Sequence, residues 1–334
     1  MKWLAWVRAS WRDDRDRWFL AGAALALAAT FLQPTLPLER SLFEHVVVFD
    51  ITQSMNVTDQ TLDGKPASRL AFAKHAMRQS LLELPCGSKV GWAVFTEYRA
   101  FLLLAPVEVC ANLGELRASL EHIDNRMAWA GNSEIAKGLH SAFGIAKALP
   151  GKPSLVFVTD GQESPPLNPR YRPAFDDKPG EVPGLIVGVG ELLPFPIPKT
   201  DPTGRPLGFW RADEVMQTDM RSQGRGAGVS GEKLMDDGGA PLVAPALGAT
   251  PGREHLSALR EAYLSLLAGE RGLGFHRLQS TQGLSLELTA PQLAKPVKVR
   301  ADGRVALAAL AFMLLLARTV APVLERMRRA WRRR

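Results

Sequence analysis

The chain has 334 residues, of which 46% are hydrophobic and 22% are charged, and its formal net charge is +7. This composition is typical of a folded protein and excludes a disordered or collagen-like chain. The charge excess lies at the two ends, because residues 1–17 contribute +2, residues 318–334 contribute +6 and residues 18–317 carry −1. A nucleic-acid-binding protein would carry positive charge on its folded body. We therefore expect no nucleic acid partner.

Apolar segments lie next to both basic ends. Residues 18–38 contain no charged residue and are long enough to cross ~30 Å of hydrocarbon. Residues 305–324 are also apolar, apart from Arg318, whose side chain can extend to the lipid headgroups. We predict two transmembrane helices; the alternatives are a cleaved signal peptide for the first segment and an amphipathic surface helix for the second.

The basic flanks predict the orientation of these helices. Positive residues favour the cytoplasmic side, which places the basic segment 1–17 and the arginine-rich tail 325–334 in the cytoplasm, where they could contact anionic lipid. The chain between the two helices then faces the periplasm of a bacterial inner membrane.

Between the apolar segments, strand patterns alternate with helix patterns. Runs of β-branched and aromatic residues predict buried strands, and apolar residues spaced three and four apart predict helices. The expected strands are 44–51, 89–96, 99–109, 154–159, 184–189 and 275–278, and the expected helices are one from Ser68 and those at 113–122, 133–149 and 254–268. This alternation predicts an α/β domain with a doubly wound, mostly parallel sheet that has one antiparallel edge strand.

Two segments interrupt this alternation. Residues 163–183 are rich in proline and charge, and residues 191–253 are rich in glycine and proline, so both are expected to be loops. We expect the domain to cover residues 42–282 with 191–253 as a long insertion. Residues 283–302 are expected to form a juxtamembrane linker.

The two cysteines, Cys86 and Cys110, flank a predicted hairpin whose turn is centred on Tyr98. Paired positions in such a hairpin sum to 196, as do 86 and 110, so the two cysteines fall at the same end of the strand pair. A disulfide is geometrically feasible there and would fit an oxidising compartment. Two buried free thiols are the alternative.

Polar oxygen-bearing residues follow the first and fourth predicted parallel strands. Asp50, Thr52 and Ser54 form a DxTxS pattern after one strand, and Asp160 follows the other. Ser133 lies between them in the sequence, at the start of a predicted helix. Because ligands of open α/β sheets bind at the carboxyl ends of the strands, we expect these five side chains to form one site.

Hydroxyl and carboxylate oxygens suit a hard divalent cation. We predict Mg²⁺ at Asp50, Thr52, Ser54, Ser133 and Asp160, with Mn²⁺ or Ca²⁺ as alternatives. Neutral hydroxyls leave residual positive charge on the ion, which favours an acidic side chain from a partner protein. Nearby Glu163 is expected to be a solvated loop residue.

These motifs resemble the metal-ion-dependent adhesion site, or MIDAS, of von Willebrand factor A (vWA) domains. The resemblance covers about residues 42–280 and assigns the same five site residues, with Thr52 where serine is commoner and Ser133 where threonine is commoner. Both replacements keep the oxygen atom. The resemblance implies a non-catalytic domain that binds partner proteins through a metal ion.

A second segment extends this resemblance to bacterial membrane-anchored vWA proteins encoded beside MoxR-type AAA+ ATPases. It runs from Pro196-Ile197-Pro198 through Asp201 and Gly204 to Gly208-Phe209. Together with the two apolar flanks, it is similar to the accessory vWA proteins of methanol-oxidation operons. The resemblance implies the ATPase and other membrane vWA proteins as partners, and a role in maturing a periplasmic enzyme such as methanol dehydrogenase.

Enzyme motifs are not found in the sequence. It has no GxSxG elbow, no P-loop and no GxGxxG after a strand, and its six histidines lack zinc spacing. An aspartyl phosphatase would need a second carboxylate two residues after Asp50, where Thr52 stands. We expect no enzyme activity; the alternatives are a metal-delivery factor that passes its cation to a client enzyme, and a scaffold that binds through residues 191–253.

Overall fold

The computed structural model describes residues 17–33, 35–167, 171–201, 203–216, 233–236 and 253–331. Most of the basic segment 1–17, the last three residues of the tail 325–334 and much of the insertion 191–253 lie outside these ranges. The chain divides into two compact units, one formed by Ser41–Lys295 and the other by the two terminal regions, up to Arg40 and from Pro296.

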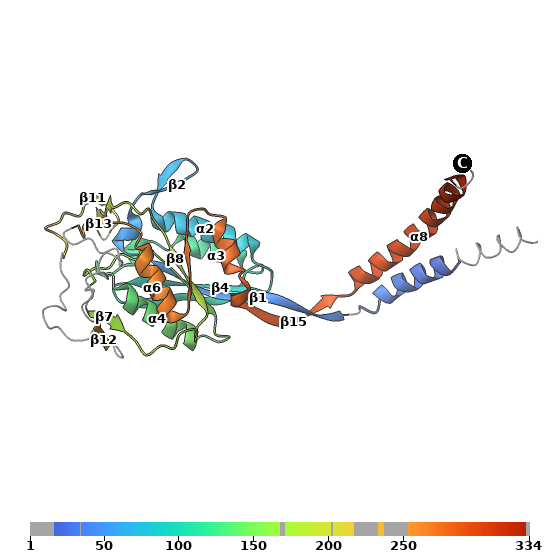
Figure 1. The fold of residues 1–334 in the computed structure, drawn as a ribbon, viewed down its shortest axis with the longest axis horizontal. Coiled ribbons are helices and arrows are strands. Elements are labelled where there is room, and N and C mark those ends of the chain that lie inside the picture. Colours follow the sequence, from blue (N-terminus) through green and yellow to red (C-terminus); the bar gives the residue numbers. More distant parts are fainter. Residues whose placement is uncertain are drawn as a thin grey trace, which may run out of the picture. The chain divides into compact units, whose positions relative to one another are not determined.

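The larger unit is built on a mixed, mostly parallel sheet with the strand order β14-β8-β6-β1-β4-β5 (Figure 1). Neighbouring strands are parallel throughout this order except β5, which is antiparallel to β4 and lies at one edge. β15 also pairs with β1. The strands of the sheet are β1 (Thr35–Asp50), β4 (Lys89–Thr96), β5 (Arg99–Glu108), β6 (Ser154–Thr159), β8 (Gly184–Gly188), β14 (Gly274–Arg277) and β15 (Ala294–Asp302).

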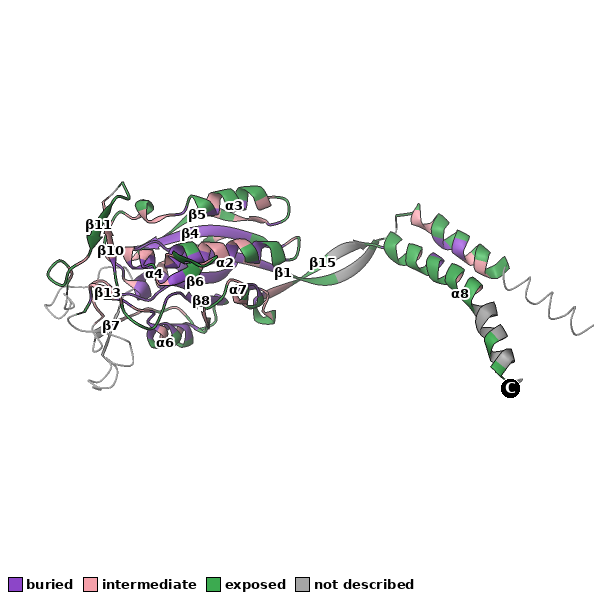
Figure 2. Cartoon of the chain, turned by 90° about the horizontal axis from the view of Figure 1, so that it is seen from above, coloured by how far each residue is buried: buried purple, intermediate pink, exposed green. Residues whose placement is uncertain are grey.

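Helices cover both faces of this sheet, as predicted for a doubly wound fold. Side chains alternate along β1, so that Val47 and Phe49 pack with α2, α3 and α7, and Val46 and Val48 pack with α4 and α6. The central strands are buried from both sides (Figure 2). The helices of this unit are α2 (Arg69–Glu83), α3 (Leu113–Glu121), α4 (Ile135–Ala148), α6 (Glu261–Arg271) and α7 (Gly283–Leu288), with short 3-10 helices η1 (Gln53–Asn56), η2 (Asn125–Met127) and η4 (Pro291–Leu293).

The β4–β5 hairpin forms where it was predicted, but its register is not constant. The turn is Glu97-Tyr98, so pairs near it sum to 195, and two irregularities beside Trp92 raise this sum to 197 at the open end. Gly91 permits the irregular backbone, because a Cβ there would lie 2.5 Å from the carbonyl oxygen of Leu104. The turn at Tyr98 therefore forms as predicted, but the predicted pairing sum of 196 holds only at Trp92 and Leu104.

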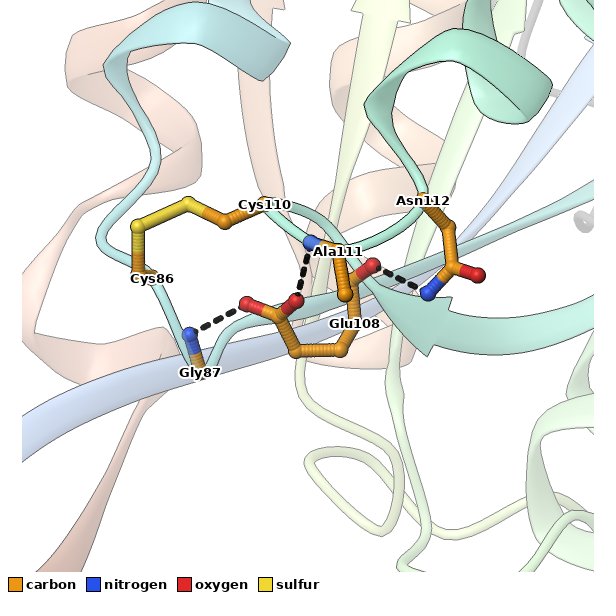
Figure 3. Close-up of a disulfide and its surroundings, with 6 residues drawn as sticks. All are labelled: Cys86, Gly87, Glu108, Cys110, Ala111 and Asn112. Atoms are coloured by element: carbon orange, nitrogen blue, oxygen red, sulfur yellow. Dashed lines mark hydrogen bonds between the residues drawn. A yellow bond between two sulfur atoms is a disulfide. The ribbon is translucent and has the colours of Figure 1, made fainter.

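Cys86 and Cys110 are joined in a disulfide at the open end of this hairpin, with their Cα atoms 5.3 Å apart (Figure 3). Glu108 supports the same corner, because its carboxylate accepts hydrogen bonds from the backbone N–H groups of Gly87 and Ala111. These bonds hold the pKa of Glu108 below its ordinary value. The disulfide thus links the segment before β4 to the segment after β5.

Short two-stranded sheets lie outside the main sheet, and most of their strands fall in the segments 163–183 and 191–253 that were expected to be loops. β10 pairs with β11, and Gly204 and Gly208 in this hairpin have φ of 86° and 98°, which explains two glycines of the second motif. α6 begins seven residues later than predicted, because the residues before it form β13 and the turn to Arg260. The small sheets are β2 (Gln60–Leu62) with β3 (Lys65–Ala67), β7 (Tyr171–Ala174) with β12 (Lys233–Asp236), β9 (Phe195–Pro196) with β13 (Leu256–Ser257), and β10 (Pro198–Thr200) with β11 (Pro206–Phe209).

The terminal unit contains a helix at residues 17–30, the first residues of β1, most of β15 and α8 (Arg304–Trp331). The helix predicted over residues 18–38 is shorter in the structure because β1 begins at Thr35, and Pro37 in the predicted segment cannot continue a helix. In the described parts of the chain, none of the helices combines the length and apolar character needed to cross a membrane. Both helices expose large apolar side chains, among them Trp18, Leu25, Val305 and Phe312.

Candidate cation site

The candidate site lies at the carboxyl ends of β1 and β6, which are neighbours at the centre of the sheet. The strand order reverses at this point, since the chain continues from β1 to β4 on one side and later enters β6 on the other. Asp50 ends β1 and Asp160 directly follows β6. This is the switch point at which doubly wound sheets bind ligands.

Asp50 is fully buried and receives three hydrogen bonds. Its Oδ1 accepts from the backbone N–H of Thr52 at 2.9 Å and from Thr52 Oγ1 at 2.7 Å, and its Oδ2 accepts from Thr159 Oγ1 at 2.6 Å. Burial and the nearby carboxylate of Asp160 nevertheless raise the pKa of Asp50 to about 7. The hydrogen-bond donors of the site therefore do not fully offset the negative charge of its two carboxylates.

Ser54 connects the two acidic residues. Its hydroxyl donates to Asp160 Oδ1 at 3.1 Å and lies 3.3 Å from Thr52 Oγ1. Because η1 turns directly after Thr52, Asp50, Thr52 and Ser54 share one tight turn, as the DxTxS pattern predicted. The structure thus brings four of the five predicted residues into one hydrogen-bonded cluster.

Ser133, the fifth predicted residue, lies immediately before the first turn of α4. Its backbone N–H donates to the carbonyl of Ser164 at 2.7 Å, and its carbonyl accepts from Ser164 N–H at the same distance. Its hydroxyl is buried and has no hydrogen-bond partner. A buried hydroxyl without a partner is costly, yet this one lines the same cavity as Thr52 and Ser54.

Arg69 is a site residue that no sequence motif indicated. Its side chain is fully buried at the start of α2, where Nη1 donates to Asp160 Oδ2 and Nη2 to Asp59 Oδ2, both at 2.6 Å. It also donates to the hydroxyl and carbonyl of Ser257. Burial alone would lower the pKa of Arg69, but the carboxylates of Asp160 and Asp59 raise it above its ordinary value. An arginine beside an N-cap serine gave no signal of this role in the sequence.

Glu163 is buried, which corrects the expectation that it is solvated. Its Oε1 accepts from the backbone N–H of Ile135, the first residue of α4, at 3.1 Å, and from Tyr263 OH at 2.5 Å. Burial and the Glu163 carboxylate raise the pKa of Tyr263 well above its ordinary value. Glu163 therefore accepts a hydrogen bond from a backbone N–H group at the N-terminus of α4, close to Ser133 in the sequence.

A cavity of about 180 Å³ opens above these residues. The hydroxyl-bearing residues Thr52, Ser54 and Ser133 line it and are each at most 4% exposed. The described residues of 195–216, which we call the strap, also line it, with Ile197, Trp210, Glu214, Val215 and Met216. Part of the long insertion thus covers the predicted site.

The donor set fits a hard cation better than a metal that prefers imidazole or thiolate ligands, such as zinc. In the ranges that the structure describes, no group of three or more His, Cys, Asp or Glu side chains could hold a metal ion. The cluster instead offers two carboxylates and three hydroxyls, and the unpartnered hydroxyl of Ser133 is the atom that a ligand would satisfy. Oxygen donors of this kind match Mg²⁺, Mn²⁺ or Ca²⁺.

No protein-family model matches the chain, and no curated protein is similar to it in sequence. Among solved structures, an aerotolerance-related membrane protein from Bacteroides fragilis, with multiple mutations to serines, is 18% identical over 74% of this chain and 96% of that chain, with a TM-score of 0.46. A von Willebrand factor type A structure from Catenulispora acidiphila is 12% identical over 78% of this chain and 44% of its own, with a TM-score of 0.36. The ArnB paralog VWA2 from Sulfolobus acidocaldarius is 12% identical over 77% of this chain and 47% of its own, with a TM-score of 0.35. The chain thus spans less than half the length of the latter two, and likenesses this distant assign no function.

Proposed function

We propose that this protein is a non-catalytic, vWA-like domain that holds a divalent cation at Asp50, Thr52, Ser54, Ser133 and Asp160. Through the cation it binds an acidic side chain of a partner protein. The strand order and the position of the DxTxS turn at the switch point support the vWA-like assignment.

The observation that carries the proposal is the hydroxyl of Ser133. It is buried and unpartnered, and Ser133 lines the same cavity as Thr52 and Ser54, at the end of the sheet that carries two carboxylates. Folded proteins rarely leave such an atom unsatisfied. A bound cation would accept its lone pair and those of Thr52 and Ser54.

Charge balance supports a divalent ion. With Asp50, Asp59 and Asp160 ionised and Arg69 positive, the four coupled side chains carry a net charge of −2, and all four are buried. Buried charge is costly unless it is paired. A divalent cation would bring this cluster to neutrality, and Mg²⁺ fits because it binds oxygen donors and retains water ligands.

The composition of the cavity supports binding rather than catalysis. Its described lining residues include no His, Cys or Lys, and its two carboxylates, Glu214 and Glu254, pair with Lys199 and Arg260. The five side chains supply fewer ligands than the six positions of an octahedral Mg²⁺ ion. An acidic group from outside would therefore complete the coordination.

We further propose that the protein is membrane-associated, with the sheet-bearing unit in an oxidising compartment. The apolar side chains exposed on the helix at 17–30 and on α8 support membrane association, and the Cys86–Cys110 disulfide supports the compartment. Two membrane spans are the proposal from the apolar segments 18–38 and 305–324. A MoxR-type ATPase partner and a role in maturing a periplasmic enzyme such as methanol dehydrogenase are implications of the sequence resemblance. Delivery of the cation to a client enzyme remains the alternative.

Isothermal titration calorimetry of the purified full chain with Mg²⁺, Mn²⁺ and Ca²⁺ tests the cation site. We expect binding of one cation per chain and loss of that binding in Asp50→Ala. Glu121→Ala is the matched control, because this carboxylate is exposed and pairs only with Arg78 among the described ion pairs. If the wild-type chain bound none of the three ions, the proposed function would be wrong.

A further inference from the structure

We propose that the partner enters the cation site as an extended segment, with an acidic side chain in the first cavity and an apolar side chain two residues away in a neighbouring cavity. This inference rests on the proposed function, because the cation is what holds the acidic group. It adds the shape and the sequence pattern of the partner.

The first cavity is too deep for a flat surface of a partner protein to reach its hydroxyl-bearing residues. Thr52, Ser54 and Ser133 are each at most 4% exposed, whereas Met216, which also lines the cavity, is 39% exposed. The volume of about 180 Å³ is smaller than the ~300–1,000 Å³ of sites for drug-sized ligands. Only a protruding group of about side-chain size can therefore reach the hydroxyls.

A second cavity of about 200 Å³ lies next to the first, and the two share the lining residues Gln53 and Gly131. Gln53 is held between them, since its Oε1 accepts a hydrogen bond from Trp210 Nε1. The remaining lining residues come from the loop around η2 and from the strap: Asn125, Arg126, Ala128, Trp129, Ala130, Thr200 and Asp201.

The second cavity suits a neutral side chain with an apolar body. Its two charged residues are already engaged, because Arg126 pairs with Asp124 at 2.6 Å and Asp201 accepts from the backbone and hydroxyl of Thr203. Trp129 contributes an aromatic ring that is 53% exposed. An apolar side chain of the partner could bury the free part of this ring.

Two adjacent cavities favour an extended ligand. In an extended segment, residues i and i+2 point to the same side, and pockets for alternate side chains are a recurrent mode of peptide recognition. An acidic residue in the first cavity therefore places the residue two positions away over the second. The apolar wall of Ile197, Trp210, Val215 and Met216 would shield the carboxylate–cation contact from water.

Binding of synthetic heptapeptides by the purified full chain tests this inference. The set carries a central Asp or Glu with the positions two residues before and after it varied, and matched peptides carry Asn or Gln at the centre. Fluorescence polarisation in Mg²⁺ should show binding only of the acidic peptides, with at least about tenfold tighter binding, ~1.4 kcal/mol, when one of the varied positions is apolar.

Trp129→Ala should abolish this apolar preference while Mg²⁺ binding by calorimetry is unchanged. Leu82→Ala, which removes a comparably exposed side chain from α2, should keep the preference. Mg²⁺ binding without any peptide binding, or peptide binding without the apolar preference, would overturn the inference and leave the cation site intact. Absence of Mg²⁺ binding would instead overturn the proposed function, and with it this inference.

Discussion

Arg69 Nη1 lies 2.6 Å from Asp160 Oδ2, and both side chains are fully buried. The same guanidinium binds Asp59, whose Oδ2 also accepts from the backbone N–H of Glu191, and it binds Ser257. Glu191 lies at the start of the long insertion and Ser257 lies just after it. Arg69 therefore connects the cation site to both ends of the segment that covers it.

Replacing Arg69 with Met should strongly destabilise the fold. The change leaves the carboxylates of Asp59 and Asp160 buried without their cationic partner, and breaking a buried pair in this way costs ~3–5 kcal/mol. Urea denaturation without added cation measures the loss. Arg78→Met removes an arginine from a largely exposed ion pair with Glu121 and should cost less than ~1 kcal/mol. Equal losses in the two variants would contradict the role given to Arg69.

Removing the disulfide should lower the free energy of unfolding, because the unfolded chain without the bond has more conformational freedom. The bond closes a loop between residues 24 apart in sequence, for which the chain-entropy model gives about 3.5 kcal/mol. The double variant Cys86→Ala/Cys110→Ala should therefore unfold at lower urea concentration than the oxidised wild type. Dithiothreitol should produce a similar loss in the wild type and none in the double variant. A wild type unaffected by the reductant would count against the bond.

Acid should destabilise the protein through His45. Burial lowers the pKa of this side chain to about 4. The hydrogen bond with Leu288 O favours the protonated form, whereas the positive charge of Lys295 disfavours it. The unfolded state has a pKa near ~6.5, so it binds the proton first as the pH falls. The stability contributed by neutral His45 is complete above pH ~6.5 and decreases between there and pH ~4.

Comparison with His45→Gln isolates this effect, because Asp50 titrates in the same range in both proteins. Between pH 7.5 and 5 the wild type should lose about 2 kcal/mol more stability than the variant. Urea denaturation at both pH values in cation-free buffer gives the two slopes. Parallel slopes would mean that His45 does not titrate as its burial requires.

Gly138 should be essential to the packing of α4. A Cβ at this position would lie 2.0 Å from Phe95 Cε2, and overpacking of this kind costs ~1–3 kcal/mol. Gly144 lies in the same helix with open space around it, so Gly144→Ala should instead stabilise the protein by ~0.5–1 kcal/mol. Thermal unfolding of the two variants should therefore shift in opposite directions. A stabilised Gly138→Ala would contradict the close approach of α4 to β4.

The sheet and most of its helices could be predicted from local sequence patterns. The apolar run ending at Asp50 and the run at 154–159 are buried on both faces, so their hydrophobicity is continuous and easily recognised. Ser68 was expected to begin a helix, and it caps α2 by accepting from Ala71 N. Asp50 and Asp160 lie at the carboxyl ends of β1 and β6 as predicted, because topology fixes that edge, and Ser133 lies just before α4 as predicted.

The parts that could not be predicted depend on contacts between distant segments. Arg69 and Ser257 are 188 residues apart, so no local pattern shows that they meet. In the strap, β9 pairs with β13, which lies about 60 residues further along the chain. Glu163 resembled a loop carboxylate because its partner Tyr263 lies 100 residues away.

The central claim is that the hydroxyl of Ser133 is a ligand of the cation, and Ser133→Ala tests this claim most directly. Because this hydroxyl has no partner, its loss should leave the stability of the cation-free protein unchanged or slightly higher. Mg²⁺ affinity measured by calorimetry should fall at least about tenfold, ~1.4 kcal/mol.

Ser119→Ala provides the opposite pattern as a control. Its hydroxyl accepts from Trp92 Nε1 and donates to Glu115 O, so this variant should lose ~1 kcal/mol of stability and keep its Mg²⁺ affinity. The decisive measurement is the Mg²⁺ affinity of Ser133→Ala beside its cation-free stability. Weaker Mg²⁺ binding with undiminished stability is the predicted result, and unchanged Mg²⁺ binding with lower stability would contradict the account.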